Sequence, residues 1–300
     1  MYKFQNALLL YNVNAGEEGA DEKLSAVVPE LAKFIKELTI IRPDDQMEAR
    51  AICRRAGRYE LFIVMGGDGT VHQCLDVIAQ LEERPLLAIL PGGTSNDFSR
   101  TVGMPQDLQK AAESLATGDI VETDIGKAGN QHFVNFWSIG LAALTSQNVD
   151  SGQKKSFGPL SYMASALRTL KEAETFSYTV ETQDGQLKGE AIALFVMNGT
   201  SLATAPIPVA DISPYDGKLD LLIFKATNAA ALLELLSLRR EGANSDQLKT
   251  IDYLQADSLR IEADALKQVD MDGELYEFLT GEIRVLARHL RLLVPSGQED

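Results

Sequence analysis

The sequence contains few of the residues that build disulfide frameworks or metal clusters. It has 2 cysteines, Cys53 and Cys74, and 3 histidines in 300 residues. Each cysteine lies in a stretch with helical spacing, so neither a disulfide framework nor a thiolate metal site is expected. The histidines, His72, His132 and His289, lie far apart and lack the spacing of metal ligands. We therefore expect a reducing, cytoplasmic setting and no zinc site.

Long apolar runs are also missing. A helix that spans a membrane needs about 18 or more consecutive apolar residues, and no such run occurs. The segment Met1 to Asn6 has no basic region, and the apolar run that follows, Ala7 to Tyr11, is too short for a secretory signal. This start predicts a first strand. Any membrane contact is therefore expected to be peripheral, at the inner face of the membrane.

Positive charge is scarce. The chain has 28 Lys and Arg against 43 Asp and Glu, a formal net charge of −15. Such a balance argues against a nucleic-acid partner and against strong general attraction to anionic bilayers, because both carry negative charge. Scattered surface cations are the commoner interpretation of small basic groups in such a chain. Three such groups occur, at Lys154-Lys155, Arg168 with Lys171, and Arg239-Arg240.

Short apolar runs alternate with helical patterns up to about residue 127. This alternation indicates a parallel sheet covered by helices on both faces, in which ligands bind at the carboxyl ends of the strands. We expect residues 1–127 to form a doubly wound α/β domain. The expected strands are Leu8–Tyr11, Thr39–Ile41, Leu61–Met65 and Leu86–Leu90, and the expected helices are Leu24–Leu38, Met47–Ala56 and one from Val71.

Beyond residue 128 the pattern changes to short strands separated by turns, which predicts a mainly antiparallel β-sandwich over residues 128–300. We leave open whether the last segment returns to the first domain. A cleft between the two domains is the expected ligand site. Asp-Gly pairs, which favour β-hairpins, occur at Asp184-Gly185, Asp216-Gly217 and Asp272-Gly273. Helical insertions are expected over Gly158–Glu172 and Asn228–Arg240.

The most informative segment is an apolar strand that runs into a glycine-rich turn and then a helix, Ile63 to Val71. Gly66, Gly67 and Gly69 let the backbone approach a ligand closely, and the N-terminus of the following helix offers N–H groups to phosphate. Asp68 in this turn would repel phosphate unless a cation lay between them, which indicates Mg²⁺. The alternative is a plain turn with an Asx cap.

A second turn of the same kind follows the next strand. Pro91 to Thr94 forms the turn, and Ser95 to Arg100 opens a helix. Turns after neighbouring parallel strands meet at one edge of the sheet, so both are expected to face one ligand. Asp97 and Arg100 lie on one helical face, and an intrahelical ion pair is the alternative role for them.

Other nucleotide and hydrolase motifs are missing. A Walker A loop, Gly-x-x-x-x-Gly-Lys-Ser/Thr, does not occur, and a dinucleotide fingerprint that began at Gly67 would need glycine in place of His72. The Gly-x-Ser-x-Gly elbow of serine hydrolases does not occur either. These absences exclude the commonest alternatives for a glycine-rich phosphate loop.

The two glycine-rich motifs resemble those of the diacylglycerol kinase catalytic family, which includes bacterial lipid kinases and sphingosine and ceramide kinases. Gly66 to Thr70 resembles the nucleotide loop of the family, and Pro91 to Arg100 resembles its second signature. The resemblance runs over essentially the whole chain and implies the NAD kinase/diacylglycerol kinase-like fold, with a nucleotide-binding α/β lobe and a β lobe. The later marks of the family are Phe157-Gly158 followed by Tyr162, Asp216-Gly217-Lys218-Leu219-Asp220, and Met271-Asp272-Gly273-Glu274.

The resemblance implies a lipid kinase that uses ATP and Mg²⁺, with diacylglycerol as the first expected acceptor, phosphatidic acid as product and a role in phospholipid biosynthesis. It implies that Glu274 is the general base towards the lipid hydroxyl. We expect Asp68 and Asp97 to organise the catalytic Mg²⁺. A structural Mg²⁺ is implied at Asp216 and the main-chain oxygens of Ser213 and Lys218. The implied nucleotide-binding residues are Asn12, Asn14, Gly66, Gly67, Asp68, Gly69, Thr70, Gly93, Thr94 and Arg100.

The sequence also departs from the family pattern. Val13 replaces a usual proline, Glu17 stands where a cation is common, and His72-Gln73 replace a frequent Asn-Glu pair. These departures motivate one alternative, a non-catalytic nucleotide- or lipid-binding regulator of the same fold. NAD kinase is another, because it also uses a Gly-Gly-Asp-Gly loop. The second signature and the late Asp-Gly-Glu favour the lipid kinase.

Two expectations concern partners. The membrane lipid is expected to enter through the apolar helices around Leu160–Leu170 and Leu232–Leu238. Edge strands of the β lobe could pair between two chains, which leaves a homodimer open. Neither the identity of the lipid nor its acyl chains can be read from these residues.

Overall fold

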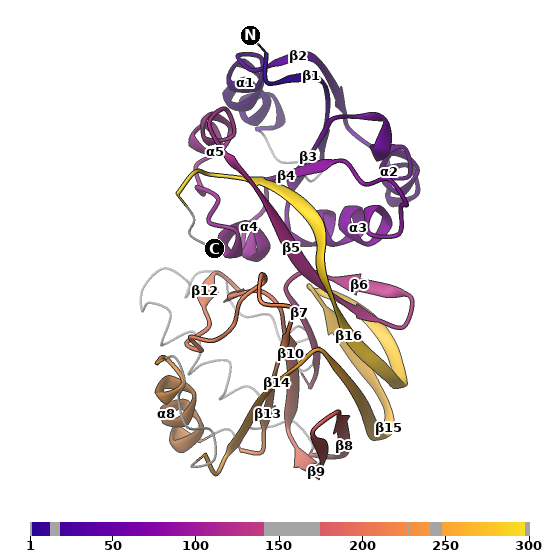
Figure 1. Cartoon of the computed structure of the whole chain (residues 1–300), viewed down its shortest axis with the longest axis vertical. Helices are drawn as coiled ribbons and strands as arrows, with labels where there is room; N and C mark the ends of the chain where they lie inside the picture. Colours follow the sequence, from indigo (N-terminus) through magenta and orange to yellow (C-terminus); the bar gives the residue numbers. More distant parts are fainter. Residues whose placement is uncertain (1, 13–18, 141–174, 227, 241–247, 298–300) are drawn as a thin grey trace. The chain divides into compact units, whose positions relative to one another are not determined.

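The computed structural model describes residues 2–12, 19–140, 175–226, 228–240 and 248–297. The chain divides into two compact units, one of residues 1–125 with 287–300 and the other of residues 126–286 (Figure 1). Two long strands, β5 (Asp119–Ala128) and β16 (Glu274–Val294), carry the chain from one unit to the other. The cleft that the sequence predicts between two domains stays a prediction.

The first unit is built on a parallel sheet with the strand order β2-β1-β3-β4. The C-terminal part of β16 extends the sheet beside β4, where Leu292 pairs in parallel with Leu87. Both β3 and β4 are buried along their whole length, as parallel strands covered on two faces should be. The four strands are β1 (Phe4–Tyr11), β2 (Ile35–Ile41), β3 (Leu61–Gly66) and β4 (Leu86–Pro91).

Helices cover both faces of this sheet, which confirms the doubly wound α/β prediction. Helix α1 (Ala20–Leu31) packs against α5 (Leu108–Ser114), and α2 (Gln46–Cys53) packs against α3 (Asp68–Ile78). The two pairs lie on opposite sides of the sheet in Figure 1. A 3-10 turn at Ala56–Arg58 precedes β3, and the short helix α4 (Asp97–Thr101) follows β4.

The helix predicted over Leu24–Leu38 is wrong at its C-terminal end. Helix α1 ends at Leu31, and β2 begins at Ile35. The backbone N–H groups of Lys3 and Phe4 donate to the carbonyl of Phe34, which starts the pairing of this segment with β1. Pairing along the edge of the sheet therefore overrides the helical preference of the Lys-Glu-Leu stretch.

The second unit is an antiparallel β-sandwich, as predicted. Its main sheet has the order β14-β13-β10-β7-β15-β16, and the β8–β9 hairpin pairs with β15. Helix α8 (Ala229–Ser237) confirms the helix predicted after Asn228, whereas the helix predicted over Gly158–Glu172 lies outside the described residues. The strands are β6 (Gln131–Phe133), β7 (Phe136–Ile139), β8 (Phe176–Thr182), β9 (Gly185–Ala191), β10 (Ala193–Met197), β11 (Ser201–Leu202), β12 (Ala205–Pro206), β13 (Leu219–Phe224), β14 (Ile251–Ala256) and β15 (Ser258–Met271).

Two of the three predicted hairpins form. Residues 183–184 turn β8 into β9, and Asp272-Gly273 joins β15 to β16 with positive φ at both positions (52° and 95°), as a tight two-residue hairpin requires. The hairpin predicted at Asp216-Gly217 is wrong. This turn leads into β13, whose partners are β10 and β14, while the preceding strand β12 pairs with β11.

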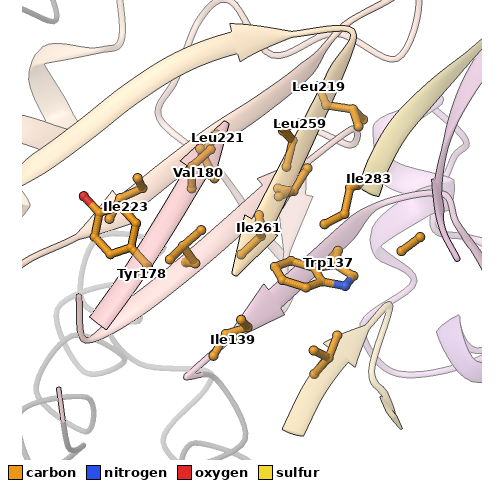
Figure 2. Close-up of a cluster of buried hydrophobic side chains, with 14 of the residues drawn as sticks. Trp137, Ile139, Tyr178, Val180, Leu219, Leu221, Ile223, Leu259, Ile261 and Ile283 are labelled. Carbon is orange, nitrogen blue, oxygen red and sulfur yellow. The ribbon is translucent and has the colours of Figure 1, made fainter. Parts of the chain in front are cut away.

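The apolar side chains of the second unit form two clusters, one on each face of its main sheet. Trp137 is fully buried in the larger cluster, beside residues of β8, β13 and β15 (Figure 2). The smaller cluster includes Leu235 of α8 and Leu238, the C-cap of this helix, together with Phe195 and Phe224 of the sheet. Helix α8 therefore covers one face, and alternating residues of β10 and β13 point to the two sides.

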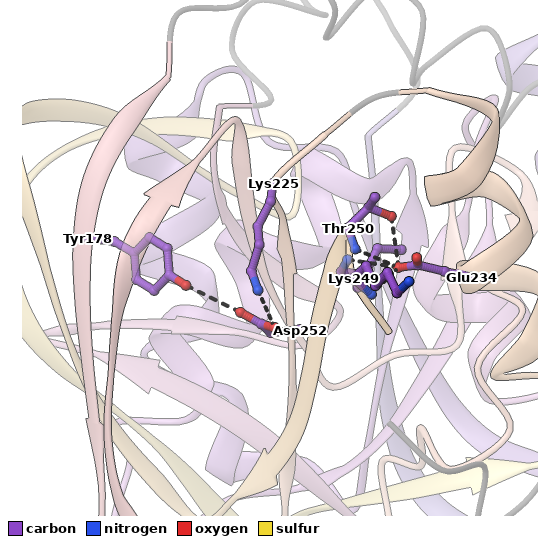
Figure 3. A network of polar contacts seen from close by, with 7 residues as sticks. Tyr178, Lys225, Glu234, Lys249, Thr250 and Asp252 are labelled. Carbon is purple, nitrogen blue, oxygen red and sulfur yellow. Dashed lines mark hydrogen bonds and ion pairs between the residues drawn. The ribbon is translucent and has the colours of Figure 1, made fainter. Parts of the chain in front are cut away.

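A single carboxylate fixes α8 to the start of β14. One oxygen of Glu234 accepts the hydroxyl of Thr250 at 2.7 Å and the backbone N–H groups of Lys249, Thr250 and Ile251 at 3.1, 2.8 and 3.1 Å (Figure 3). Burial raises the pKa of Glu234, but these hydrogen bonds outweigh it, and the pKa is lowered. Nearby, Asp252 accepts from Tyr178 and pairs with Lys225 (Figure 3).

Candidate functional site

The first glycine loop, Gly66 to Thr70, lies where β3 ends and α3 begins. Gly67 is the N-cap of α3, and the helix begins at Asp68. The sequence predicted a turn before a helix starting at Val71, so the helix begins three residues earlier than expected. Asp68, Gly69 and Thr70 therefore form the first helical turn, whose N–H groups have no acceptor within the helix. Such a turn suits phosphate.

The second glycine loop, Gly92 to Asp97, packs directly on the first. Gly92 N donates to Gly66 O at 2.9 Å. A Cβ atom on Gly93 would lie 2.5 Å from Gly67 Cα, and one on Gly92 would lie 2.8 Å from Gly66 Cα. The sequence predicted close approach of these glycines to a ligand, whereas the structure shows close approach of the two loops to each other.

Asp68 ties the two loops together. Its Oδ1 accepts the N–H of Asp97 at 2.6 Å, and its Oδ2 accepts the N–H of Asn96 at 2.9 Å. Asn96 has a positive φ of 53° and caps its own loop, accepting from Gly93 N at 2.8 Å and donating to Gly93 O at 2.9 Å. Asparagine tolerates this left-handed conformation better than most residues. The carboxylate of Asp68 is therefore held in one orientation at the carboxyl edge of the sheet.

Polar and cationic side chains surround the paired loops. Asn12, just after β1, donates to the Thr70 hydroxyl at 3.2 Å. Lys23 Nζ of α1 donates to Gly92 O at 3.2 Å, and Arg100 Nε of α4 donates to Ser95 O at 2.9 Å. Two positive charges therefore lie along the second loop, beside the negative Asp68.

The predicted general base, Glu274, is the first residue of β16 and lies in the second unit. The turn before it is anchored by Asp272, which is buried. Oδ2 of Asp272 accepts Val134 N at 2.8 Å, and Oδ1 accepts Asn135 N and Phe136 N, each at 2.9 Å. Asp270 closes the turn by accepting Gly273 N at 2.7 Å. Glu274 therefore follows a tightly held turn and is itself partly exposed.

The predicted metal residues Ser213, Asp216 and Lys218 lie in the loop before β13. Asp216 Oδ1 accepts Lys218 N at 2.9 Å. Asp220 lies two residues further on and is fully buried. Its Oδ1 accepts from Tyr253 at 2.6 Å and from Gln255 at 3.0 Å, while its Oδ2 has no hydrogen-bond partner among the described residues.

Negative charge accumulates around Asp220. The pKa of this carboxyl is raised from 3.8 to about 7, mainly by burial and also by the nearby carboxylates of Asp216 and Asp211, while the hydrogen bonds from Tyr253 and Gln255 lower it. A cation at Asp216 would relieve this repulsion. The loop therefore fits a Mg²⁺ ion held by a carboxylate and main-chain oxygens, which are hard ligands.

The loop at Asp216 and the turn before Glu274 lie at the same end of the sheet. Asp220 of β13 pairs with Met197 of β10, Met197 pairs with Phe136 of β7, and Phe136 O accepts the N–H of Asp272. These residues form one row across neighbouring strands. The structure thus places the predicted metal loop and the predicted base at one edge of the second unit.

The predicted residues form two groups. The first unit brings together Asn12, Gly66, Gly67, Asp68, Gly69, Thr70, Gly93, Thr94, Asp97 and Arg100 around the paired loops. Glu274, Ser213, Asp216 and Lys218 belong to the second unit, and Asn14 lies outside the described residues. Within the described part of the chain, no group of three or more His, Cys, Asp or Glu side chains is arranged to hold a metal ion.

Sequence reasoning missed three residues at these sites. Lys23 is a lysine in an ordinary helix, and nothing in its neighbours indicates the contact with Gly92. Asn96 and Asp272 both have positive φ, at 53° and 52°. Their positions in glycine-containing turn motifs were a usable signal, because Asn and Asp adopt a positive φ more readily than most residues.

Comparison with known proteins agrees with this arrangement. Residues 6–128 match the diacylglycerol kinase catalytic domain, and residues 135–294 match the YegS C-terminal NAD kinase beta sandwich-like domain. The chain therefore belongs to the diacylglycerol kinase catalytic-domain family.

Similar proteins cover the whole chain. A "Putative lipid kinase" of Staphylococcus haemolyticus is 30% identical over 99% of both chains, and one of Staphylococcus carnosus is 26% identical over 97% of both. The crystal structure of a putative diacylglycerol kinase from Bacillus anthracis is 34% identical in sequence, covers 99% of both chains and superimposes with a TM-score of 0.85. In the described residues, no helix is long and apolar enough to cross a membrane.

Proposed function

We propose that this protein transfers the γ-phosphate of ATP to the hydroxyl of a membrane lipid, with diacylglycerol as acceptor and phosphatidic acid as product. One observation carries the proposal. The Asp68 carboxylate locks two glycine loops together at the carboxyl edge of a parallel sheet, next to the N-terminus of α3. Membership of the diacylglycerol kinase catalytic-domain family supports phosphoryl transfer as the reaction at this site.

The ATP phosphates would be held by the first turn of α3 and by the second loop. The N–H groups of residues 68–70 have no acceptor within the helix at its N-terminus, where phosphate would lie, and the helix dipole favours negative charge there. Thr94 is exposed and Gly67 is partly exposed, and Asn12 donates a hydrogen bond to the Thr70 hydroxyl. The first turn of α3 would therefore supply the backbone donors of the site.

Catalytic Mg²⁺ would be held near Asp68 and Asp97. The Asp68 carboxylate accepts the backbone N–H groups of Asn96 and Asp97, one on each oxygen, which fixes its orientation. The donor set therefore fits a hard cation, bound directly or through water. Bound there, the ion would neutralise charge on the transferring phosphoryl group. The second ion, at Asp216 with main-chain oxygens of Ser213 and Lys218, would stabilise the loop before β13.

Glu274 would accept the proton of the lipid hydroxyl as the new oxygen–phosphorus bond forms and the bond to ADP breaks. An alcohol ionises far above neutral pH, so a base helps only as charge develops, typically by about 10²- to 10⁴-fold. Glu274→Gln should therefore lower kcat by that factor and leave the affinity for ATP unchanged. Glu277→Gln is a matched control, because Glu277 is exposed on the same strand and pairs with Gln268.

Peripheral contact with the membrane would use the outer side of α8. Leu233 is 67% exposed, and Arg239 and Arg240 follow at the exposed end of the helix. An exposed leucine beside two arginines suits an anionic lipid surface. Leu233→Ser should weaken co-sedimentation with anionic vesicles, whereas Leu187→Ser, at a 37% exposed site on β9, should not. The segment around Leu160–Leu170 lies outside the described residues, and a homodimer stays a prediction.

The test is transfer of label from γ-labelled ATP to a panel of lipids in mixed micelles, with Mg²⁺ and with chelator, beside NAD as a soluble acceptor. Label in phosphatidic acid or another phosphorylated lipid, lost with chelator, supports the proposal and identifies the acceptor. Label in NADP would replace it with NAD kinase. Nucleotide binding without any labelled product would favour a non-catalytic regulator.

A further inference from the structure

The backbone of the second glycine loop, Gly92 to Asp97, is largely engaged inside the protein. Gly92 N donates to Gly66 O at 2.9 Å, and Gly93 N donates to the side chain of Asn96 at 2.8 Å. An N–H group that already has a well-placed acceptor turns to a ligand only by losing that hydrogen bond. These two N–H groups are therefore poor phosphate donors.

The same holds at the other end of the loop. Asn96 N and Asp97 N both donate to the Asp68 carboxylate, at 2.9 and 2.6 Å. Hydrogen bonds to a charged acceptor are about twice as strong as neutral ones. Two adjacent pairs of N–H groups, one at each end of the second loop, thus form hydrogen bonds within the protein. The loop differs in this from a phosphate-binding nest, in which successive N–H groups point at the anion.

Phosphate beside these four positions would therefore be met by side chains. Two cations contact the loop, and they come from different helices. Lys23 Nζ donates to Gly92 O at its beginning, at 3.2 Å, and Arg100 Nε donates to Ser95 O near its end, at 2.9 Å. Lys23 is partly buried, so its ammonium group is held at the loop rather than dispersed in solvent.

We propose that Lys23 binds the phosphate chain of the nucleotide substrate. The proposal rests on the function proposed above and adds a binding residue to it. ATP carries several negative charges and would lie beside the negative Asp68 and Asp97, so the site needs positive charge as well as Mg²⁺. Lys23 supplies it from the α1 side, and Arg100 supplies it from the α4 side. An ammonium group has three N–H donors and suits phosphate as a point charge.

A phosphate-binding cation distinguishes nucleotides by their phosphates. Loss of the Lys23 ammonium group should weaken the binding of ATP, which carries phosphates. The binding of adenosine, which has none, should be unaffected. A structural role of Lys23, through its bond to Gly92 O, would instead disturb the loop and weaken both ligands. The ratio of the two affinities therefore separates the two roles.

The experiment is isothermal titration of the full chain with ATP and with adenosine, without lipid. Lys23→Met should weaken ATP binding about 10- to 100-fold, the equivalent of one charge-assisted hydrogen bond, and change adenosine binding less than about twofold. Lys23→Gln, which keeps a donor for Gly92 O but no charge, should behave like Lys23→Met. Lys23→Arg should retain most of the affinity.

Lys36→Met is the matched control. Lys36 is exposed near the amino end of β2, so it lies at the edge of the sheet opposite the glycine loops. This variant should bind both ligands as the wild type does. Unchanged ATP affinity in both Lys23→Met and Lys23→Gln, or an equal loss for adenosine, would overturn the proposal while leaving the kinase function standing. A wild type that binds neither ligand would remove the proposed function itself and this proposal with it.

Discussion

Replacing Gly93 with alanine is expected to force the two glycine loops apart. The new Cβ would lie 2.5 Å from the Cα of Gly67, against 3.4 Å for an ordinary contact, and neither atom can be moved by a rotamer change. The loops must therefore separate by roughly 1 Å, because protein interiors have no spare volume at such a contact. That displacement stretches the hydrogen bonds from Asn96 and Asp97 to Asp68.

The magnitude follows from three contributions. Overpacking costs about 1–3 kcal/mol, and weakening hydrogen bonds to a charged acceptor adds a share of about 1.5–3 kcal/mol. The lower entropy of the unfolded alanine chain offsets about 0.4–1 kcal/mol. The net expectation for Gly93→Ala is therefore a loss of about 2–3 kcal/mol in the free energy of unfolding of the first unit.

Gly67→Ala provides the control on the same pair of residues. Its Cβ would lie 3.4 Å from the Cα of Gly93, and its φ and ψ of −84° and −180° are accessible to alanine. The poorer N-cap preference of alanine and the gain from the unfolded state are small and opposite in sign, so the stability should change by less than about 0.5 kcal/mol.

The assay is urea unfolding followed by far-ultraviolet circular dichroism, with hydrogen exchange of the amides in β3 and β4 to locate the effect. Two units need not unfold in one step, so the local exchange rates decide the comparison. Equal stability of Gly93→Ala and Gly67→Ala, or exchange that increases only in the second unit, would refute the tight packing of the two loops.

Three further outcomes are expected in the second unit, where Trp137 is the single tryptophan and its fluorescence reports unfolding. Asp272→Asn keeps a residue that tolerates positive φ but removes an acceptor for the N–H groups of residues 134–136, so stability should fall by roughly 1–3 kcal/mol; an unchanged urea midpoint would count against this anchor. The folded-state pKa of Asp220, about 7, lies above its unfolded value of 3.8, so wild-type stability in chelator should fall as pH rises from about 4 to about 7. Asp220→Asn should remove this fall, which amounts to a difference in the free energy of unfolding on the order of 2–4 kcal/mol at pH 8. Parallel pH profiles of stability for the wild type and the variant would contradict this expectation. Glu234→Gln should speed hydrogen exchange in α8 severalfold, since the neutral amide accepts the four hydrogen bonds less strongly; protection equal to wild type would show that packing alone holds the helix.

Local pattern predicted most of the first unit. Strands β3 and β4 are continuous apolar runs that end in glycine turns, and both features are visible in the sequence without any knowledge of the fold. Helix α1 shows the limit. The segment from Ile35 to Leu38 has helix-forming residues, and only its pairing with β1, a contact distant in the sequence, makes it a strand.

The sequence predicted which residues belong to the site better than it predicted the contacts between them. The motif positions of Asp68 and Asn96 were visible, but the hydrogen bonds between them join segments that the sequence places 28 residues apart. Lys23 contacts Gly92, which lies 69 residues further along the chain, and no local pattern encodes such a contact. The turn at Asp216 was mistaken for a hairpin because an Asp-Gly pair specifies a turn and does not specify which strands pair on either side.

Formation of labelled phosphatidic acid from γ-labelled ATP and diacylglycerol is the measurement that tests the lipid kinase function most directly, made in parallel on the wild type, Glu274→Gln and Glu277→Gln. Mg²⁺-dependent product from the wild type and Glu277→Gln, with turnover reduced about 10²- to 10⁴-fold in Glu274→Gln, is the predicted result. Full turnover in Glu274→Gln would contradict the assigned base, and the absence of labelled lipid from the wild type with every acceptor would contradict the lipid kinase function.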